Sequence, residues 1–71
     1  MNTELIGTWA GEVWRALNEA VVLDIKQLRK ISKLKEKEVI AALGWLAREG
    51  KIAFEESADE KKETLVRLLS E

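Results

Sequence analysis

Residues 38–54, which read EVIAALGWLAREGKIAF, place a helical pattern directly before a strand pattern, with a glycine between them. Apolar residues in the first part recur at the three- and four-residue spacing of one helix face, namely Val39, Ala42, Leu43 and Leu46. Gly50 follows where a left-handed residue can end a helix, and Arg48 precedes it in the last turn. Ile52 and Phe54 then alternate with other residues, as in a strand that buries one face. A helix that ends at Gly50 and is followed directly by a strand is therefore the feature that constrains the fold most.

The chain is short and has no residues that could cross-link it. Its 71 residues include neither Cys nor His, which removes disulfides and the usual zinc sites. We predict one domain over residues 1–71, of marginal stability because a chain of this length buries only about 60 % of its unfolded surface. A homodimer would supply the missing stabilisation. There is no signal-peptide pattern and no apolar run of ~18 residues, so we expect a cytoplasmic protein with no membrane partner.

The charges are unevenly distributed along the chain. The net charge is −1, but residues 26–37 hold six bases and one acid, for a local charge of +5. Residues 1–25 and residues 38–71 each have a net charge of −3. A basic segment in a nearly neutral protein indicates an electrostatic contact surface.

The N-terminal segment predicts a helix that starts at Thr3 and runs to about residue 19 or 20. Its core face is marked by Ile6, Ala10, Val13 and Leu17, with Trp9 and Trp14 on the flanks. Gly7 and Gly11 each cost the helix roughly 1 kcal/mol relative to Ala. Two explanations stay open: another helix of the same chain crosses closely there, or Gly7, Trp9 and Gly11 contact a second subunit.

Residues 21–37 have the pattern of a helix-turn-helix. Residues 21–23 are a β-branched run of the length of an edge strand, and Asp24 is placed to cap a helix over residues 25–31. Leu28 and Ile31 are expected to face inward, and Leu34 to fill the turn at residues 32–34. A third helix would begin at residue 35 or 36. Two helices joined by three or four residues form this motif, although Lys33 stands where a glycine is typical.

The C-terminal segment is ambiguous. Residues 57–63, SADEKKE, lack large apolar residues and are typical of a hairpin tip. Thr64, Val66 and Leu68 alternate as in a returning strand, whereas the leucines also suit a helix capped by Asp59. We predict a strand within residues 59–69 that pairs antiparallel with residues 52–56, because an unpaired strand leaves its backbone groups unsatisfied. The predicted fold is α+β, a winged helix-turn-helix with three helices and a small antiparallel β-hairpin as the wing.

The blocks DIKQLRKISKLKEKEV and AALGWLAREGKIAF resemble a family of small, stand-alone bacterial winged helix-turn-helix proteins of unknown function. The shared features are Leu28 and Leu34 around the turn, Val39, and the run from residue 42 to residue 52. The resemblance covers nearly the whole chain and is weakest over the last dozen residues. It implies the fold and a role in DNA binding, and it implies no catalytic residues and no cofactor.

DNA binding follows from the geometry expected of a winged helix. The start of the third helix faces the major groove in this fold, while the second helix crosses the backbone. We therefore predict a DNA-binding set in which Lys33, Lys35 and Lys37 are central and Lys26 and Lys30 are outer contacts, with Lys61 and Lys62 on the wing. Lysine suits phosphate better than base edges, so binding should be weak and largely phosphate-driven. Glu36 and Glu38 would oppose it, and the lysines could instead be a solvated face.

The alternative function is a protein–protein interaction or dimerisation adaptor that does not bind DNA. Trp45 lies away from the core face of the third helix and, with Trp9, could form an exposed apolar patch. The predicted dimer interface therefore consists of Gly7, Trp9, Gly11 and Trp45, unless both tryptophans simply close the core. An enzyme is not expected: the chain has no His or Cys, no phosphate-binding glycine loop, and only scattered carboxylates. We expect no metal, cofactor or small-molecule substrate.

Overall fold

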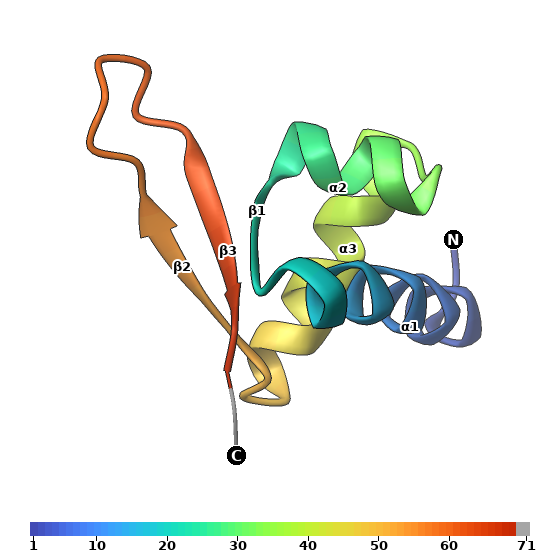
Figure 1. Ribbon diagram of the computed structural model, residues 1–71. Coiled ribbons are helices and arrows are strands. Elements are labelled where there is room, and N and C mark those ends of the chain that lie inside the picture. Colours follow the sequence, from blue (N-terminus) through green and yellow to red (C-terminus); the bar gives the residue numbers. More distant parts are fainter. Residues whose placement is uncertain (70–71) are drawn as a thin grey trace.

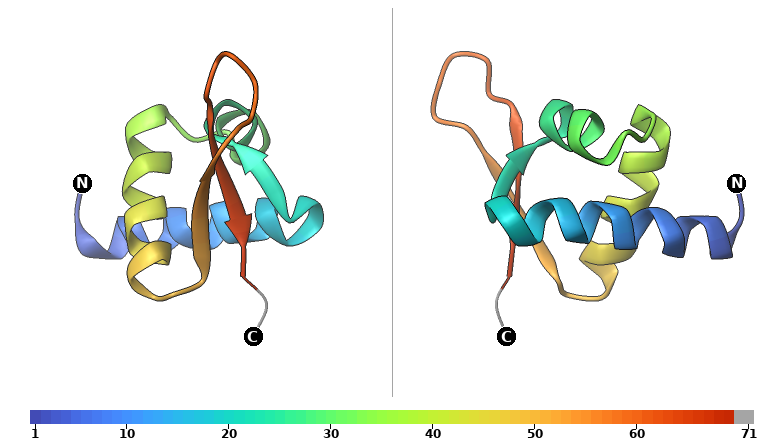
Figure 2. Two further views of the ribbon diagram at one scale, coloured as in Figure 1. Left: turned by 90° about the vertical axis from the view of Figure 1, so that its left-hand side faces the viewer. Right: turned by 45° about the vertical axis from the view of Figure 1, so that its right-hand side comes forward.

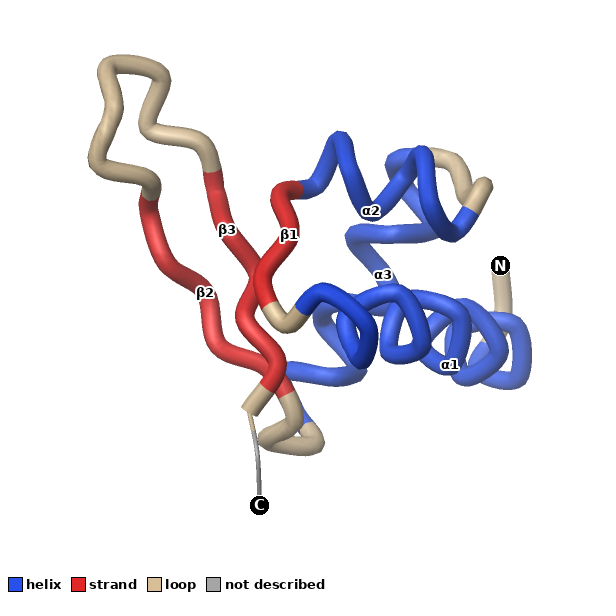
Figure 3. Tube along the Cα trace, in the orientation of Figure 1, coloured by secondary structure: helices blue, strands red, loops and turns tan. Residues whose placement is uncertain are grey.

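The computed structural model describes residues 1–69 and has three helices and three strands (Figure 1). The helices lie together to one side of the sheet, and the β2–β3 hairpin extends past them, as Figures 2 and 3 show. The predicted α+β winged helix-turn-helix fold is confirmed. In chain order the elements are α1 (Thr3–Ala20), β1 (Val22–Asp24), α2 (Ile25–Ser32), α3 (Glu36–Arg48), β2 (Ile52–Glu56) and β3 (Thr64–Leu68).

The last strand, β3, lies in the middle of the sheet. The strand order is β1-β3-β2, and β3 pairs antiparallel with both neighbours. Val66 of β3 is opposite Leu23 of β1 on one side and Phe54 of β2 on the other. The returning strand is therefore confirmed over Thr64–Leu68, and no helix forms there. The short run that begins at Val22 is an edge strand, as its length predicted.

The core lies between α1, α3 and the inner face of the sheet. The four residues predicted for the inner face of α3 are all buried, and Gly50 turns the chain after α3 with a φ of 72°. Gly50 and Lys51 donate backbone hydrogen bonds to carbonyls of the last turn of α3, at 3.0 Å each. The largest fully buried side chains are those of Val13, Leu17, Leu28, Val39 and Val66.

At the start of each helix a side chain accepts a hydrogen bond from a backbone N–H group. α1 starts at Thr3, as predicted, and Asn2 caps it by accepting a hydrogen bond from the backbone N–H of Leu5 at 2.8 Å. Asp24 caps α2 as predicted and forms a reciprocal capping box with Gln27. At the start of α3 the carboxylate of Glu38 accepts a hydrogen bond from the backbone N–H of Lys35 at 2.8 Å.

Two apolar residues expected to face inward are half exposed. The side chain of Ile31 in α2 is 50 % exposed and that of Phe54 in β2 is 51 % exposed. α2 has only 8 residues, and its single buried position is Leu28, so within residues 1–69 the flank that carries Ile31 is only partly covered. Phe54 shares a sheet face with Val66, but it lies on the edge strand of a hairpin that extends past the helices (Figure 1).

Lys33 has the left-handed conformation that the turn between α2 and α3 requires. Its φ is 62° and its ψ is 23°, in a region that disfavours residues with a Cβ. The hydroxyl of Ser32 donates to the carbonyl of Leu28 at 2.5 Å and accepts from the backbone N–H of Leu34 at 3.3 Å. These bonds hold the turn, and Leu34 packs against the core from it.

Truncation of Leu28 and Ile31, two of the three large apolar residues of α2, should affect stability very differently. We expect Leu28→Ala to lower the free energy of unfolding by about 2–5 kcal/mol, because it leaves a cavity in a closed core. The matched change Ile31→Ala should alter it by no more than about 0.5 kcal/mol. Urea denaturation of both variants measures this. Losses of equal size would mean that Ile31 is buried after all.

The strained turn generates a second prediction. Lys33→Gly should raise the free energy of unfolding by up to about 1 kcal/mol, because glycine adopts the left-handed region without a Cβ clash. Lys30→Gly removes the same charge from the interior of α2 and should lower the free energy of unfolding by about 1 kcal/mol. Thermal unfolding of these two variants tests whether Lys33 is strained. A loss of stability in both variants would show that Lys33 is not strained.

Candidate nucleic-acid interface

Four basic side chains gather on the outer face of α2. Lys26, Arg29, Lys30 and Lys33 are all exposed and, with Leu34, line one shallow depression. Their spacing of three, four and seven residues places them on one side of the helix, opposite the fully buried Leu28. We call these four residues the α2 basic face. It is the densest group of cations that the described residues form on any one element.

The structure brings together three of the five lysines predicted to bind DNA. Lys26, Lys30 and Lys33 belong to the α2 basic face, whereas Lys35 and Lys37 are exposed at the start of α3, outside the depression. Arg29 was not among the predicted site residues, although it belongs to the basic segment. The three-residue step from Lys26 to Arg29 on a helix was the signal that could have included it.

The start of α3 has a mixed charge. Lys37 stands between Glu36 and Glu38, and both acids lie in the first turn of the helix. Acidic side chains there interact favourably with the positive end of the helix dipole. They also place negative charge where a winged helix would approach DNA. Lys35 and Lys37 are therefore weaker candidates for phosphate contact than the α2 basic face.

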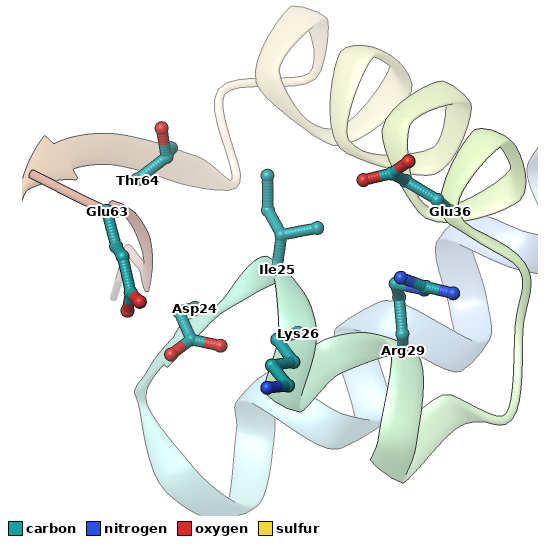
Figure 4. Close-up of a pocket in the computed structure, with 7 residues that line it drawn as sticks. All are labelled: Asp24, Ile25, Lys26, Arg29, Glu36, Glu63 and Thr64. Atoms are coloured by element: carbon teal, nitrogen blue, oxygen red, sulfur yellow. The ribbon is translucent and has the colours of Figure 1, made fainter. Parts of the chain in front are cut away.

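A groove separates α2 from the base of the wing (Figure 4). Ile25 projects into its middle, while Lys26 and Arg29 come from α2, Glu36 from α3, and Glu63 and Thr64 from the wing. The two ion pairs found among residues 1–69, Arg15–Glu12 and Arg67–Glu55, lie outside this groove. The groove thus marks the boundary between a basic helix and an acidic hairpin.

The wing is acidic. Residues 55–63 hold five acids and two bases, for a net charge of −3. Asp59 orders the tip by accepting hydrogen bonds from the backbone N–H groups of Lys61 and Lys62, at 3.1 and 3.2 Å. At the base, Arg67 binds both carboxylate oxygens of Glu55, at 2.8 and 3.0 Å. This hydrogen-bonded pair lowers the pKa of Glu55 and raises the pKa of Arg67. Lys61 and Lys62, predicted as wing contacts, are therefore outnumbered by the acids of the same segment.

A separate hollow lies between α1 and α3, the two helices that cross in Figure 2. We call it the α1–α3 hollow; it is lined by Gly7, Ala10, Gly11, Trp14, Trp45, Leu46 and Lys51. A Cβ atom on Gly7 would be 3.9 Å from the Trp45 ring, and one on Gly11 would have nothing within 4 Å. Close packing inside the chain therefore does not require either glycine.

The tryptophans divide between the core and this hollow. Trp9 is half-buried and packs against the core, as one of the two interpretations of the sequence allowed. Trp45 lies at the hollow and is 37 % exposed, and Trp14, also at the hollow, is 39 % exposed. Of the predicted interface residues, Gly7, Gly11 and Trp45 thus share one surface, and Trp14 joins them where Trp9 was expected.

Residues 1–69 show neither a metal-binding cluster nor a membrane-spanning helix. No group of three or more acidic side chains in this range is arranged to hold a metal ion. No helix in the same range is both long enough and apolar enough to cross a membrane.

Comparison with known proteins identifies the family. The profile of a winged helix-turn-helix domain (DUF2582) matches residues 1–68. The chain is also similar to protein BT2368 from Bacteroides thetaiotaomicron, known from a solution NMR structure, with 34 % sequence identity and a TM-score of 0.83. The match covers 96 % of this chain and 79 % of that one. A search of curated proteins found no match. The chain belongs to the winged helix-turn-helix domain family DUF2582.

Proposed function

We propose that the chain binds double-stranded DNA, mainly through phosphate groups, and acts in the cytoplasm as a regulator of transcription. The observation that carries the proposal is the α2 basic face, four cations around one depression in a fold typical of DNA-binding domains. Lys35 and Lys37, beside Glu36 and Glu38 at the start of α3, are weaker, secondary contacts. This is a binding function, and no residue is assigned a catalytic role.

The residue types favour phosphate over base edges as the target. Five of the six bases in residues 26–37 are lysines, whose flexible point charge neutralises phosphate but does not match a guanine edge. Arg29 is the single side chain there with a planar fork for two parallel hydrogen bonds. Binding should therefore depend strongly on salt and weakly on sequence.

A salt titration with random duplex DNA tests the proposal. If binding neutralises about four phosphates, the logarithm of the binding constant should fall with the logarithm of the salt concentration with a slope near −3.6. We expect a Kd in the micromolar range or weaker at physiological salt. Fluorescence anisotropy at several salt concentrations measures both quantities.

The matched control for this titration is Lys51→Gln, which removes one cation at the α1–α3 hollow, away from the α2 basic face. It should leave the slope unchanged. Absence of binding to any duplex at low salt would contradict the proposal. The basic segment would then be a solvated face, and the adaptor function would be the better account.

Self-association is a second proposal, and the α1–α3 hollow supports it. Gly7 and Gly11 each cost α1 roughly 1 kcal/mol relative to Ala, yet the chain has room for a Cβ at both positions. Trp14 and Trp45 stay partly exposed beside them. In a two-fold dimer, an exposed indole of one copy would lie over the glycines of the other. DNA binding and dimerisation are compatible, since many helix-turn-helix proteins bind DNA as dimers.

Replacement of Gly11 separates a dimer contact from a folding effect. Gly11→Ala fits within its own chain, so it should raise the free energy of unfolding of the monomer by about 1 kcal/mol. It should nevertheless weaken the dimer, because the methyl group occupies the site of the partner's side chain. Trp45→Ala should weaken the dimer as well. Sedimentation equilibrium from micromolar to millimolar concentration measures the effect.

Gly44→Ala is the control, because Gly44, like Gly11, is helical but lies outside the hollow and is exposed. A Cβ atom added to Gly44 would likewise meet nothing within 4 Å. This change should stabilise the fold without altering association. A parent protein that is monomeric at millimolar concentration would rule out the dimer.

A further inference from the structure

We infer that DNA lies along helix α2 and that α3 stays outside the major groove. The inference rests on the proposed DNA binding and specifies its geometry, which reverses the usual roles of the two helices in this fold. It follows from the chemistry of three surfaces: the exposed side of α3, the wing, and the α2 basic face.

The exposed side of α3 offers few groups that could read base edges. Away from the core it presents Lys37, Ile40, Gly44 and Arg48, and Ile40 is 50 % exposed. The whole helix contains no Ser, Thr, Asn or Gln. The two cations are eleven residues apart, or about 16 Å along the axis. If α3 entered the major groove, the stretch between Lys37 and Arg48 would remove water from base acceptors without replacing the hydrogen bonds of that water.

The end of α3 that would meet the DNA first is also its acidic end. Glu36 and Glu38 lie in the first turn, and the bond from the backbone N–H of Lys35 holds the Glu38 carboxylate in place. The indole N–H of Trp45 is a hydrogen-bond donor, but Trp45 belongs to the α1–α3 hollow on another side of the helix. α3 is therefore poorly suited to a groove that is lined by phosphates.

The wing adds a second unfavourable contact for the usual geometry. Its residues 55–63 have a net charge of −3, and Glu63 faces the groove between the wing and α2 (Figure 4). A duplex placed across α3 and the wing would bring these carboxylates close to the phosphate backbone. Repulsion should instead keep the DNA on the α2 basic face, where Lys30 and Lys33 lie outside the groove beside the wing.

The α2 basic face has the length and the charge that a phosphate contact needs. Its residues span about 10 Å from Lys26 to Lys33 at 1.5 Å per residue. Duplex DNA carries a negative charge every ~1.7 Å of its axis, so several phosphates lie within that span. Asp24, Glu36 and Glu63 line the groove beside Lys26 and Arg29, but within residues 1–69 none of them forms an ion pair with these cations, and Asp24 is engaged in the capping box with Gln27. The four cations can thus act together on the backbone.

Three charge variants of the full chain test the inference, with circular dichroism as the check of folding. Lys26→Gln with Lys30→Gln should reduce the salt slope by about 1.8, at 0.9 per lost phosphate contact, and should weaken binding about tenfold. Lys35→Gln with Lys37→Gln removes the same charge and should change the affinity for random duplex DNA less than about twofold. Ile40→Glu places a carboxylate in the middle of α3 and should leave the salt slope unchanged.

The outcomes separate the inference from the proposed function. A loss of binding in the α2 variant alone supports the inference. Binding that is lost equally in both double variants, or lost in Ile40→Glu, would place α3 at the DNA and overturn the inference while DNA binding stands. A parent protein that binds no duplex at low salt would overturn the proposed function, and the inference with it.

Discussion

The pairing of β3 with both of its neighbours is the interaction on which the rest of the structure depends. β1 and β2 do not pair with each other, and each finds its hydrogen-bond partner only when the end of the chain returns between them. Val66 at the centre of β3 is fully buried and joins the sheet to the helical core. Because residues 22–24 thereby meet residues 65–67, the fold is closed by contacts that are distant in sequence.

The same pairing sets the electrostatic character of the surface. β1 passes into α2 without a linker, since Asp24 ends the strand and also caps the helix. Fixing β1 against β3 therefore fixes the α2 basic face beside the acidic wing, with one groove between them (Figure 4). Two segments of opposite charge and remote sequence become neighbours in this way. The surface is therefore electrostatically polarised: α2 attracts an anionic ligand on one side of the groove, and the wing repels it on the other.

Local sequence signals predicted the elements well. The third helix (Glu36–Arg48), the stop at Gly50, the Asp24 cap and the edge strand all follow from spacing, helix termini and β-propensity, which act over a few residues. The predicted hairpin needed one further argument, that a strand requires a partner. Burial was harder to predict at the periphery: Ile31 and Phe54 match an apolar pattern, but no element within residues 1–69 covers them.

The candidate site was predicted only in part, for a related reason. The basic segment of residues 26–37 was evident in the sequence, but the helix boundary at Lys33 divides it between two elements. Helical spacing could have grouped Arg29 with Lys26, Lys30 and Lys33. Only three-dimensional placement shows that Lys35 and Lys37 do not share their depression. In the same way, Trp14 and Trp45 share a hollow because α1 and α3 cross, which helical periodicity within either segment does not reveal.

The central claim is that phosphate contacts of α2 hold the DNA. Mapping of backbone amide chemical shifts during titration with a random duplex at low salt tests it most directly, because every element reports separately. The account predicts the largest shift changes over residues 26–33, with small changes over residues 38–47 of α3 and residues 55–63 of the wing. The largest changes over α3 and the wing, with α2 unperturbed, would contradict it.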